Sequence, residues 1–159
     1  MIRTRAFSLI ELVIVIVIIG AISAIAIPRL TRGATQSQAV ALKADLAVMR
    51  NAIEQYRAEH EGRFPDDKST VAGQLTMYTK TDGTDANPVP DVASGRIYGP
   101  YLRAIPSLPL GSRKGTTGFG DTPPGSADVG WFYDGTTGKI WAALDLDEQD
   151  VSGTPWSMY

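Results

Sequence analysis

The sequence predicts an α+β fold, in which a long N-terminal helix packs on a small C-terminal antiparallel β-sheet with long loops. Three patterns predict it: an apolar run near the N-terminus, an apolar stripe at helical spacing further along, and two β-branched, aromatic runs joined by a glycine-containing turn. The first half of the helix is expected to be transmembrane and the second half amphipathic. The 159 residues suggest one compact domain.

The composition excludes several classes of function. The formal net charge of −2, from 15 basic and 17 acidic residues, argues against a general nucleic-acid binder, so we expect no nucleic-acid partner. The absence of cysteine excludes disulfides, thiolate metal sites and cysteine nucleophiles. The only histidine, His60, is expected to end a helix rather than to bind a ligand. Because no nucleophile elbow or other catalytic constellation occurs, we expect no enzymatic activity and no required cofactor.

The N-terminal segment is predicted to cross a membrane. A basic leader, residues 1–6, precedes an apolar run that begins at Phe7. This run is about 21 residues long, or roughly 31 Å as a helix, which matches the thickness of a bilayer core. A backbone in lipid must satisfy its own hydrogen bonds, so the many valines and isoleucines do not make the segment a strand. We expect residues 7–28 to be a membrane helix that ends or kinks near Pro28.

Glu11 interrupts the apolar run. A carboxylate inside a membrane helix costs about 2.5–3.5 kcal/mol at mid-membrane, and less near the end of the helix, where Glu11 lies. Two interpretations follow. Glu11 either reaches water at the level of the lipid headgroups, or it awaits a positive partner supplied by another protein.

A conventional signal peptide is the alternative interpretation of the same segment. Arg3 and Arg5 form a basic n-region, and residues 24–26 resemble a small-residue cleavage site. Cleavage after Ala26 would leave a secreted or membrane-anchored, non-catalytic binding domain. Against this alternative, Glu11 interrupts the apolar region, and the apolar run exceeds the usual length of about 7–15 residues.

The second half of the predicted helix carries an apolar stripe. Its members recur at steps of three and four, and they are Ala39, Leu42, Leu46, Met49, Ile53, Tyr56 and His60. Gly62 supplies the C-cap signal and Pro65 prevents continuation, so the helix is expected to extend to about residue 61. A short helix from a Ser69 cap to Thr79 is expected to follow.

The rest of the exposed domain, which is expected to comprise residues 29–159, is rich in turns. Residues 82–95 and 110–128 are predicted to be loops, and the Gly118–Gly120 triplet lacks the lysine and frame of a phosphate loop. Residues 129–144 are predicted to form a hairpin, because two strand-like runs flank a turn at 135–138. Its aromatic residues are expected to pack against the helix stripe, since a two-stranded ribbon alone is marginal.

The segment Arg5-Ala6-Phe7-Ser8-Leu9-Ile10-Glu11-Leu12 resembles the processing site of the type IV pilin and type II secretion pseudopilin superfamily. The resemblance implies that a prepilin peptidase cuts between Ala6 and Phe7 and methylates the new amino group of Phe7. Ala6 stands where the family usually has glycine. Glu11 corresponds to the carboxylate of the family, which implies a pair with the Phe7 amino group of a neighbouring subunit.

Further positions resemble the same superfamily. Gly20 and Pro28 fall where many pilins carry a helix-weakening glycine and proline. The segment Gly99–Pro106 looks like the "GPYL…IP" segment of the major pseudopilins. This segment, the short body and the lack of cysteine favour the type II secretion branch, while a minor or DNA-uptake pseudopilin stays open.

The resemblance implies a structural subunit of a type II secretion pseudopilus, or of a related filament, that assembles through its N-terminal helix to drive protein secretion. The implied partners are the prepilin peptidase, sister subunits in a homopolymer, and an inner-membrane assembly platform. The implied location is the inner membrane, spanned once, with the C-terminal domain in the periplasm. The basic leader favours a cytoplasmic N-terminus.

The acidic C-terminal tail has two interpretations. Major pseudopilins, to which the chain is similar, bind calcium in an acidic C-terminal loop, which implies a calcium site at Asp145, Asp147 and Asp150. The spacing lacks the glycine and the distal glutamate of a calcium hand loop, which favours a solvated acidic tail instead.

Overall fold

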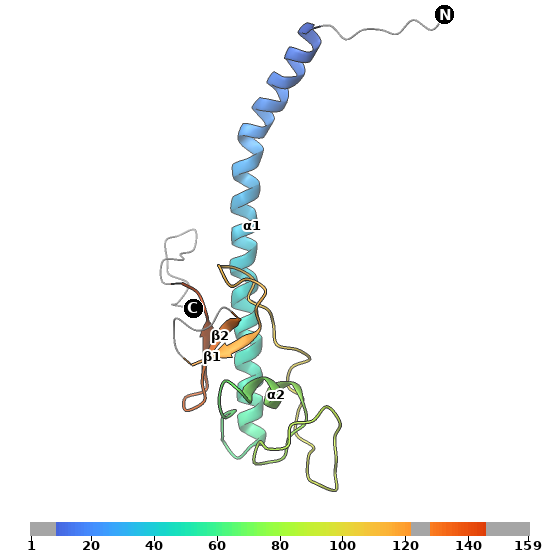
Figure 1. Ribbon diagram of the computed structural model, residues 1–159, viewed down its shortest axis with the longest axis vertical. Coiled ribbons are helices and arrows are strands. Elements are labelled where there is room, and N and C mark those ends of the chain that lie inside the picture. Colours follow the sequence, from blue (N-terminus) through green and yellow to red (C-terminus); the bar gives the residue numbers. More distant parts are fainter. Residues whose placement is uncertain (1–8, 122–127, 146–159) are drawn as a thin grey trace, which may run out of the picture. The chain divides into compact units, whose positions relative to one another are not determined.

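The structure is a computed structural model that describes residues 9–121 and 128–145 (Figure 1). The described elements follow the order α1, α2, β1, β2, β3, which makes the chain an α+β protein as the sequence predicts. The chain divides into two compact units, Met1–Ser37 and Gln38–Tyr159. The predicted boundary between membrane segment and exposed domain, at residues 28 and 29, stays a prediction.

Helix α1 extends from Leu9 to Glu59 and contains 51 residues. It continues through Pro28, so the predicted end there is wrong, while the alternative of a kink near Pro28 stays a prediction. A proline removes one backbone hydrogen bond, whereas the turns on both sides keep theirs and hold the helical conformation. The part from Leu9 to Ala26 is long and apolar enough to cross a membrane, with a mean hydropathy of 2.9 and no burial within the protein.

The core of the second unit forms around the apolar stripe of α1, as predicted. Leu42, Met49 and Tyr56 are at most 1% exposed, and the stripe packs against Trp131 and Tyr133 of the sheet. Helix α2, Val71–Thr76, adds its own buried apolar side chains to the same core. Burial of the stripe therefore joins three segments that are distant in the sequence (Figure 1).

The sheet has three strands in the order β1-β2-β3, and it is mixed rather than antiparallel. Strand β2, Val129–Asp134, pairs antiparallel with β3, Lys139–Ala142, which confirms the predicted hairpin but ends it before Leu144. Strand β1, Gly118–Gly120, pairs parallel with β2 inside a segment predicted to be a loop. The strand needs glycine at this position, because a Cβ on Gly118 would approach the Asp128 carbonyl oxygen to 2.5 Å. Glycine is typical of loops, so the sequence carries no strand signal here.

The pairing of β1 with β2 contains a bulge that sorts the side chains of β2. Gly118 pairs with Val129 while Phe119 pairs with Trp131, so Gly130 is the extra residue. Val129 consequently joins Phe132 in a second small apolar cluster, while Trp131 stays in the main core.

Two helix ends differ in detail from the sequence prediction. At the end of α1 the left-handed conformation begins at Glu61, one residue before the predicted Gly62, and the Gly62 amide donates to the Arg57 carbonyl at 2.9 Å. The short helix starts after Thr70 rather than after Ser69. The reason is the Asp67 carboxylate, which accepts the backbone amide of Ser69 and so completes a turn before α2.

His60 is fully buried directly after the last residue of α1. Its Nδ1 lies 2.8 Å from the Tyr56 carbonyl oxygen, which only accepts, so Nδ1 carries a hydrogen, and Nε2 is hydrogen-bonded to the Thr79 hydroxyl at 2.9 Å. The ring also stacks on Tyr56, with centroids 3.7 Å apart. Both nitrogens are thus used by the fold, as expected for a helix-end residue.

We predict that Ile53→Ala lowers the free energy of unfolding of the body by about 2–5 kcal/mol, because it opens a cavity at the centre of the stripe. Gln55→Ala on the exposed face is the matched control and should change it by less than about 0.5 kcal/mol. Urea titration of the full chain in detergent, followed by tryptophan fluorescence, measures both values. Equal effects would contradict the assignment of the stripe as core.

We predict that the body loses stability as the pH falls below about 4. Hydroxyl groups of Ser69, Thr84 and Thr137 donate to the carboxylates of Asp67, Asp82 and Asp134, and these bonds hold the pKa of each carboxyl below its usual 3.8. A lowered native pKa stabilises the fold above the unfolded pKa, and this contribution is lost as the pH falls through the native value. Melting temperatures between pH 7 and pH 2 should therefore decline, with a shallower decline in Asp134→Asn; a rise in acid would contradict this.

Candidate functional site

Glu11 lies in the first turn of α1 as it is described, on a segment with no protein covering. Its neighbours Ile10 and Leu12 are 66% and 59% exposed. Among the described residues, Glu11 has no hydrogen-bond or ion-pair partner. The segment is therefore an uncovered apolar cylinder with one carboxylate. Such a surface can be buried in lipid or against other helices, and in either place the carboxylate gains from a cation brought by a partner.

The other predicted positions of the N-terminal segment are placed differently. Ala6 and Phe7, between which cleavage is predicted, lie outside the described residues, as does the leader. Gly20 lies within α1, and a Cβ built there meets no atom within 4 Å. Helix α1 therefore continues through Gly20, and the weakening of the helix there stays a prediction. Pro28 also lies within α1.

The predicted calcium site is described only at Asp145. One oxygen of this carboxylate accepts the Ser112 hydroxyl at 2.7 Å, and the other lies 3.7 Å from the Arg113 guanidinium. Asp147 and Asp150 lie outside the described residues. Within the described part of the chain, no group of three or more acidic or histidine side chains could hold a metal ion. An arginine beside Asp145 already supplies a positive charge, so the described residues do not favour calcium there, and the calcium site stays a prediction.

The segment Gly99–Pro106 connects elements of the second unit. The backbone amides of Tyr101 and Leu102 both donate to the Leu75 carbonyl at the end of α2, at 2.9 Å. The Tyr101 hydroxyl donates to the Glu59 carboxylate at the end of α1, at 2.6 Å. Burial and this bond to an anion raise the pKa of Tyr101, so the hydroxyl stays protonated and keeps donating. The segment that resembles the pseudopilins therefore links the end of α1 to the end of α2 by hydrogen bonds.

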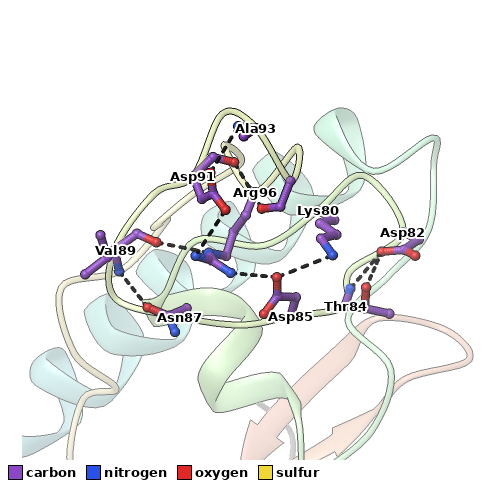
Figure 2. A network of polar contacts seen from close by, with 10 residues as sticks. Lys80, Asp82, Thr84, Asp85, Asn87, Val89, Asp91, Ala93 and Arg96 are labelled. Carbon is purple, nitrogen blue, oxygen red and sulfur yellow. Dashed lines mark hydrogen bonds and ion pairs between the residues drawn. The ribbon is translucent and has the colours of Figure 1, made fainter.

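A polar network in the loop that follows α2 was not predicted from the sequence. Figure 2 shows the Arg96 guanidinium between Asp85, Asp91 and the backbone of Val89. Arg96 Nη1 lies 2.6 Å from Asp85 and Nε donates to the Val89 carbonyl at 3.0 Å. The turn dipeptides Asp-Gly at 82–83, Asn-Pro at 87–88 and Ser-Gly at 94–95 mark this region as a loop in the sequence. The spacing of one arginine among aspartates does not show which of them it binds.

A cleft of about 610 Å³ lies between the turn before α2 and the β2–β3 hairpin. Its walls carry Asp66, Asp67 and Asp134, together with an ion pair between Lys68 and Asp121. Each of these three carboxylates accepts a hydrogen bond from a nearby side chain: Asp66 from Gln74, Asp67 from the Ser69 hydroxyl, and Asp134 from the Thr137 hydroxyl. These bonds tie the turn before α2 and the hairpin turn to the walls of the cleft.

An N-terminal processing motif followed by an uncovered apolar helix, which continues as the core helix of an α+β body, defines a pilin-like protein. Residues 1–27 match the family described as "Prokaryotic N-terminal methylation motif". The chain therefore carries a prepilin-type methylation motif at its N-terminus, and it is homologous to type II secretion system core protein G.

Three relatives carry that name. The protein of Klebsiella pneumoniae is 26% identical over 110 residues, covering 69% of this chain and 71% of the relative. The protein of Pectobacterium carotovorum subsp. carotovorum is 27% identical over 110 residues, covering 69% of this chain and just under two thirds, 64%, of the relative. The protein of Klebsiella michiganensis is 26% identical over 107 residues, covering 67% of this chain and 68% of the relative. No solved structure matches the chain significantly. These likenesses support a structural subunit of a pseudopilus.

Proposed function

We propose that this chain is a structural subunit of a type II secretion pseudopilus that assembles through its N-terminal helix after cleavage of residues 1–6. The observation that carries the proposal is the methylation motif over residues 1–27, which directly overlaps an apolar helix without protein cover. The relatives named core protein G support the same role. The role is structural and non-catalytic, and it requires no cofactor.

The physical basis of assembly is the relief of a lone charge. Glu11 lies in an apolar segment and has no partner among the described residues. Cleavage between Ala6 and Phe7 creates a new amino group four residues before Glu11. We propose that a neighbouring copy displaced along the membrane normal brings its Phe7 amino group to this Glu11. Cleavage thereby converts a stored precursor into a subunit that gains from polymerisation.

The partners follow from this mechanism. A prepilin peptidase is needed for cleavage and methylation, sister subunits supply the charge partner, and an inner-membrane platform assembles the filament. The subunit spans the inner membrane once, with the N-terminus in the cytoplasm and residues 29–159 in the periplasm. The basic leader, with Arg3 and Arg5, favours this orientation.

We predict that the protein isolated from its native membrane begins at N-methylated Phe7. Intact mass spectrometry combined with N-terminal sequencing measures this directly. A matched variant, Phe7→Pro, should stay uncut, because proline changes the backbone on the side of the bond where the new amino group forms. A start at Ile27 would contradict the proposal and favour a secreted binding domain, and an intact Met1 would favour an anchored one.

We predict that Glu11→Leu inserts into the membrane normally but loses filament assembly by about tenfold or more, since the pairing charge is gone. Glu11→Gln tests the charge at nearly constant shape and should lose as much, whereas Glu54→Gln on the exposed face of the body should assemble normally. Filaments sheared from cells and quantified by immunoblotting measure the yield. Normal assembly of Glu11→Gln would contradict a role for the charge.

A further inference from the structure

The loop between α2 and Gly99 displays apolar side chains that the fold does not cover. Val89, Val92 and Ile97 are 62%, 83% and 49% exposed. Val92 begins a four-residue turn between Asp91 and Arg96, whose backbones exchange two hydrogen bonds of 2.8 and 2.9 Å. These three side chains are called the loop patch below. The loop patch contributes little to the core of its own subunit.

Arg96 fixes the shape of this loop. Its side chain is only 13% exposed and reaches the Val89 carbonyl, the Asp85 carboxylate and, at 4.0 Å, the Asp91 carboxylate (Figure 2). Asp85 is also held by Lys80 at 3.4 Å. The loop patch is therefore preorganised, and a partner that binds it has less conformational entropy to remove than with a mobile loop.

A second uncovered apolar surface lies on α1, opposite the stripe. The helical positions that point away from the core between residues 40 and 48 are all uncharged and exposed, and they are Val40, Ala44, Ala47 and Val48. These four residues are called the outer face of α1. Its alanines allow another backbone to approach closely. Among the described residues of the second unit, every exposed large apolar side chain belongs either to the loop patch or to this face.

We propose that the loop patch of one copy packs on the outer face of α1 in the next copy of this chain. The proposal rests on the proposed function, because it names the contact between bodies in the same homopolymer. The charges around the two surfaces are complementary. Residues 80–97 carry three aspartates against Lys80 and Arg96, which leaves one acidic charge in excess. The cations Lys43 and Arg50 lie seven residues apart along one border of the outer face, and Arg50 also donates to the Ile140 carbonyl.

This contact joins two different surfaces, so it is heterologous. A heterologous contact that does not close into a ring repeats without limit and generates a helical filament. The loop patch is small, and such a contact is weak between freely diffusing proteins. In a membrane, assembly of the N-terminal helices raises the effective concentration of the bodies, so a weak contact is sufficient to fix their register.

Cysteine crosslinking in native membranes tests the contact, because the chain contains no cysteine of its own. Full-length copies with Val92→Cys and copies with Ala44→Cys are produced together and oxidised. A disulfide needs Cα atoms about 4.4–6.8 Å apart, so dimers report close contact. Copies with Thr136→Cys, on the exposed hairpin turn, replace the Val92→Cys copies in the control. Electron microscopy of the same cells shows whether filaments form.

We expect filaments, with dimers from the 92–44 pair and none from the 136–44 pair. Filaments without 92–44 dimers, or equal dimers from both pairs, would overturn the contact and leave the proposed function standing. Dimers without filaments would support the contact but overturn assembly into a pseudopilus. The absence of both would overturn both proposals.

A matched pair of substitutions tests the charge match. Val92→Lys and Val92→Glu remove the same apolar contact, and each should leave the thermal melt of the body unchanged, since Val92 is 83% exposed. Val92→Lys brings a cation toward Lys43 and Arg50, so filament yield should fall about tenfold, and Val92→Glu should retain several times more. Equal yields from the two variants would overturn the charge match.

Discussion

The structure depends on one constraint: the two halves of a single helix must bury their apolar surfaces against different partners. In the second half, the stripe centred on Ile53 finds its partners within the same chain, in α2 and the sheet. In the first half, the apolar side chains from Leu9 to Ile25 find none. Because uncovered apolar surface of this size is unstable in water, the N-terminal half requires lipid or other helices. The described body thus covers the apolar stripe of its own half of α1, whereas the apolar side chains of the N-terminal half have no cover in the described chain.

The polar side chains of the body and of the N-terminal segment differ in the same way. In the body, His60 and Arg96 each have partners in the structure, and the described residues contain no buried side-chain polar atom without a hydrogen bond. Glu11, in the other half, has no described partner. In the proposed mechanism this charge is explained by what assembles around it, and the methylation motif and the carboxylate act in the same assembly step.

The elements predicted well from the sequence are those whose signal is side-chain periodicity. The stripe from Leu42 to Tyr56 and the alternation of Trp131, Phe132 and Tyr133 both survive in the structure because packing decides them. The prediction missed strand β1, because its pairing uses the backbone of Gly118 and Gly120 and glycine side chains give no periodicity. The start of α2 was predicted wrongly for a related reason: Asp67, Ser69 and Thr70 all have capping chemistry, and only the fold shows that Asp67 closes the preceding turn and that Thr70 is the N-cap. The cleavage site rests on resemblance, since Ala6 and Phe7 lie outside the described residues.

The loop that follows α2 shows how a surface can be specific without being large. Arg96 uses its hydrogen-bonding capacity on Asp85 and on the Val89 carbonyl rather than on any ligand. A loop that only had to connect α2 with Gly99 would gain little from such restraint while it leaves Val92 in solvent. Restraint of an exposed apolar turn is useful when the turn must meet a second surface in one orientation, repeatedly. A polymer whose bodies share one register imposes that requirement on every subunit.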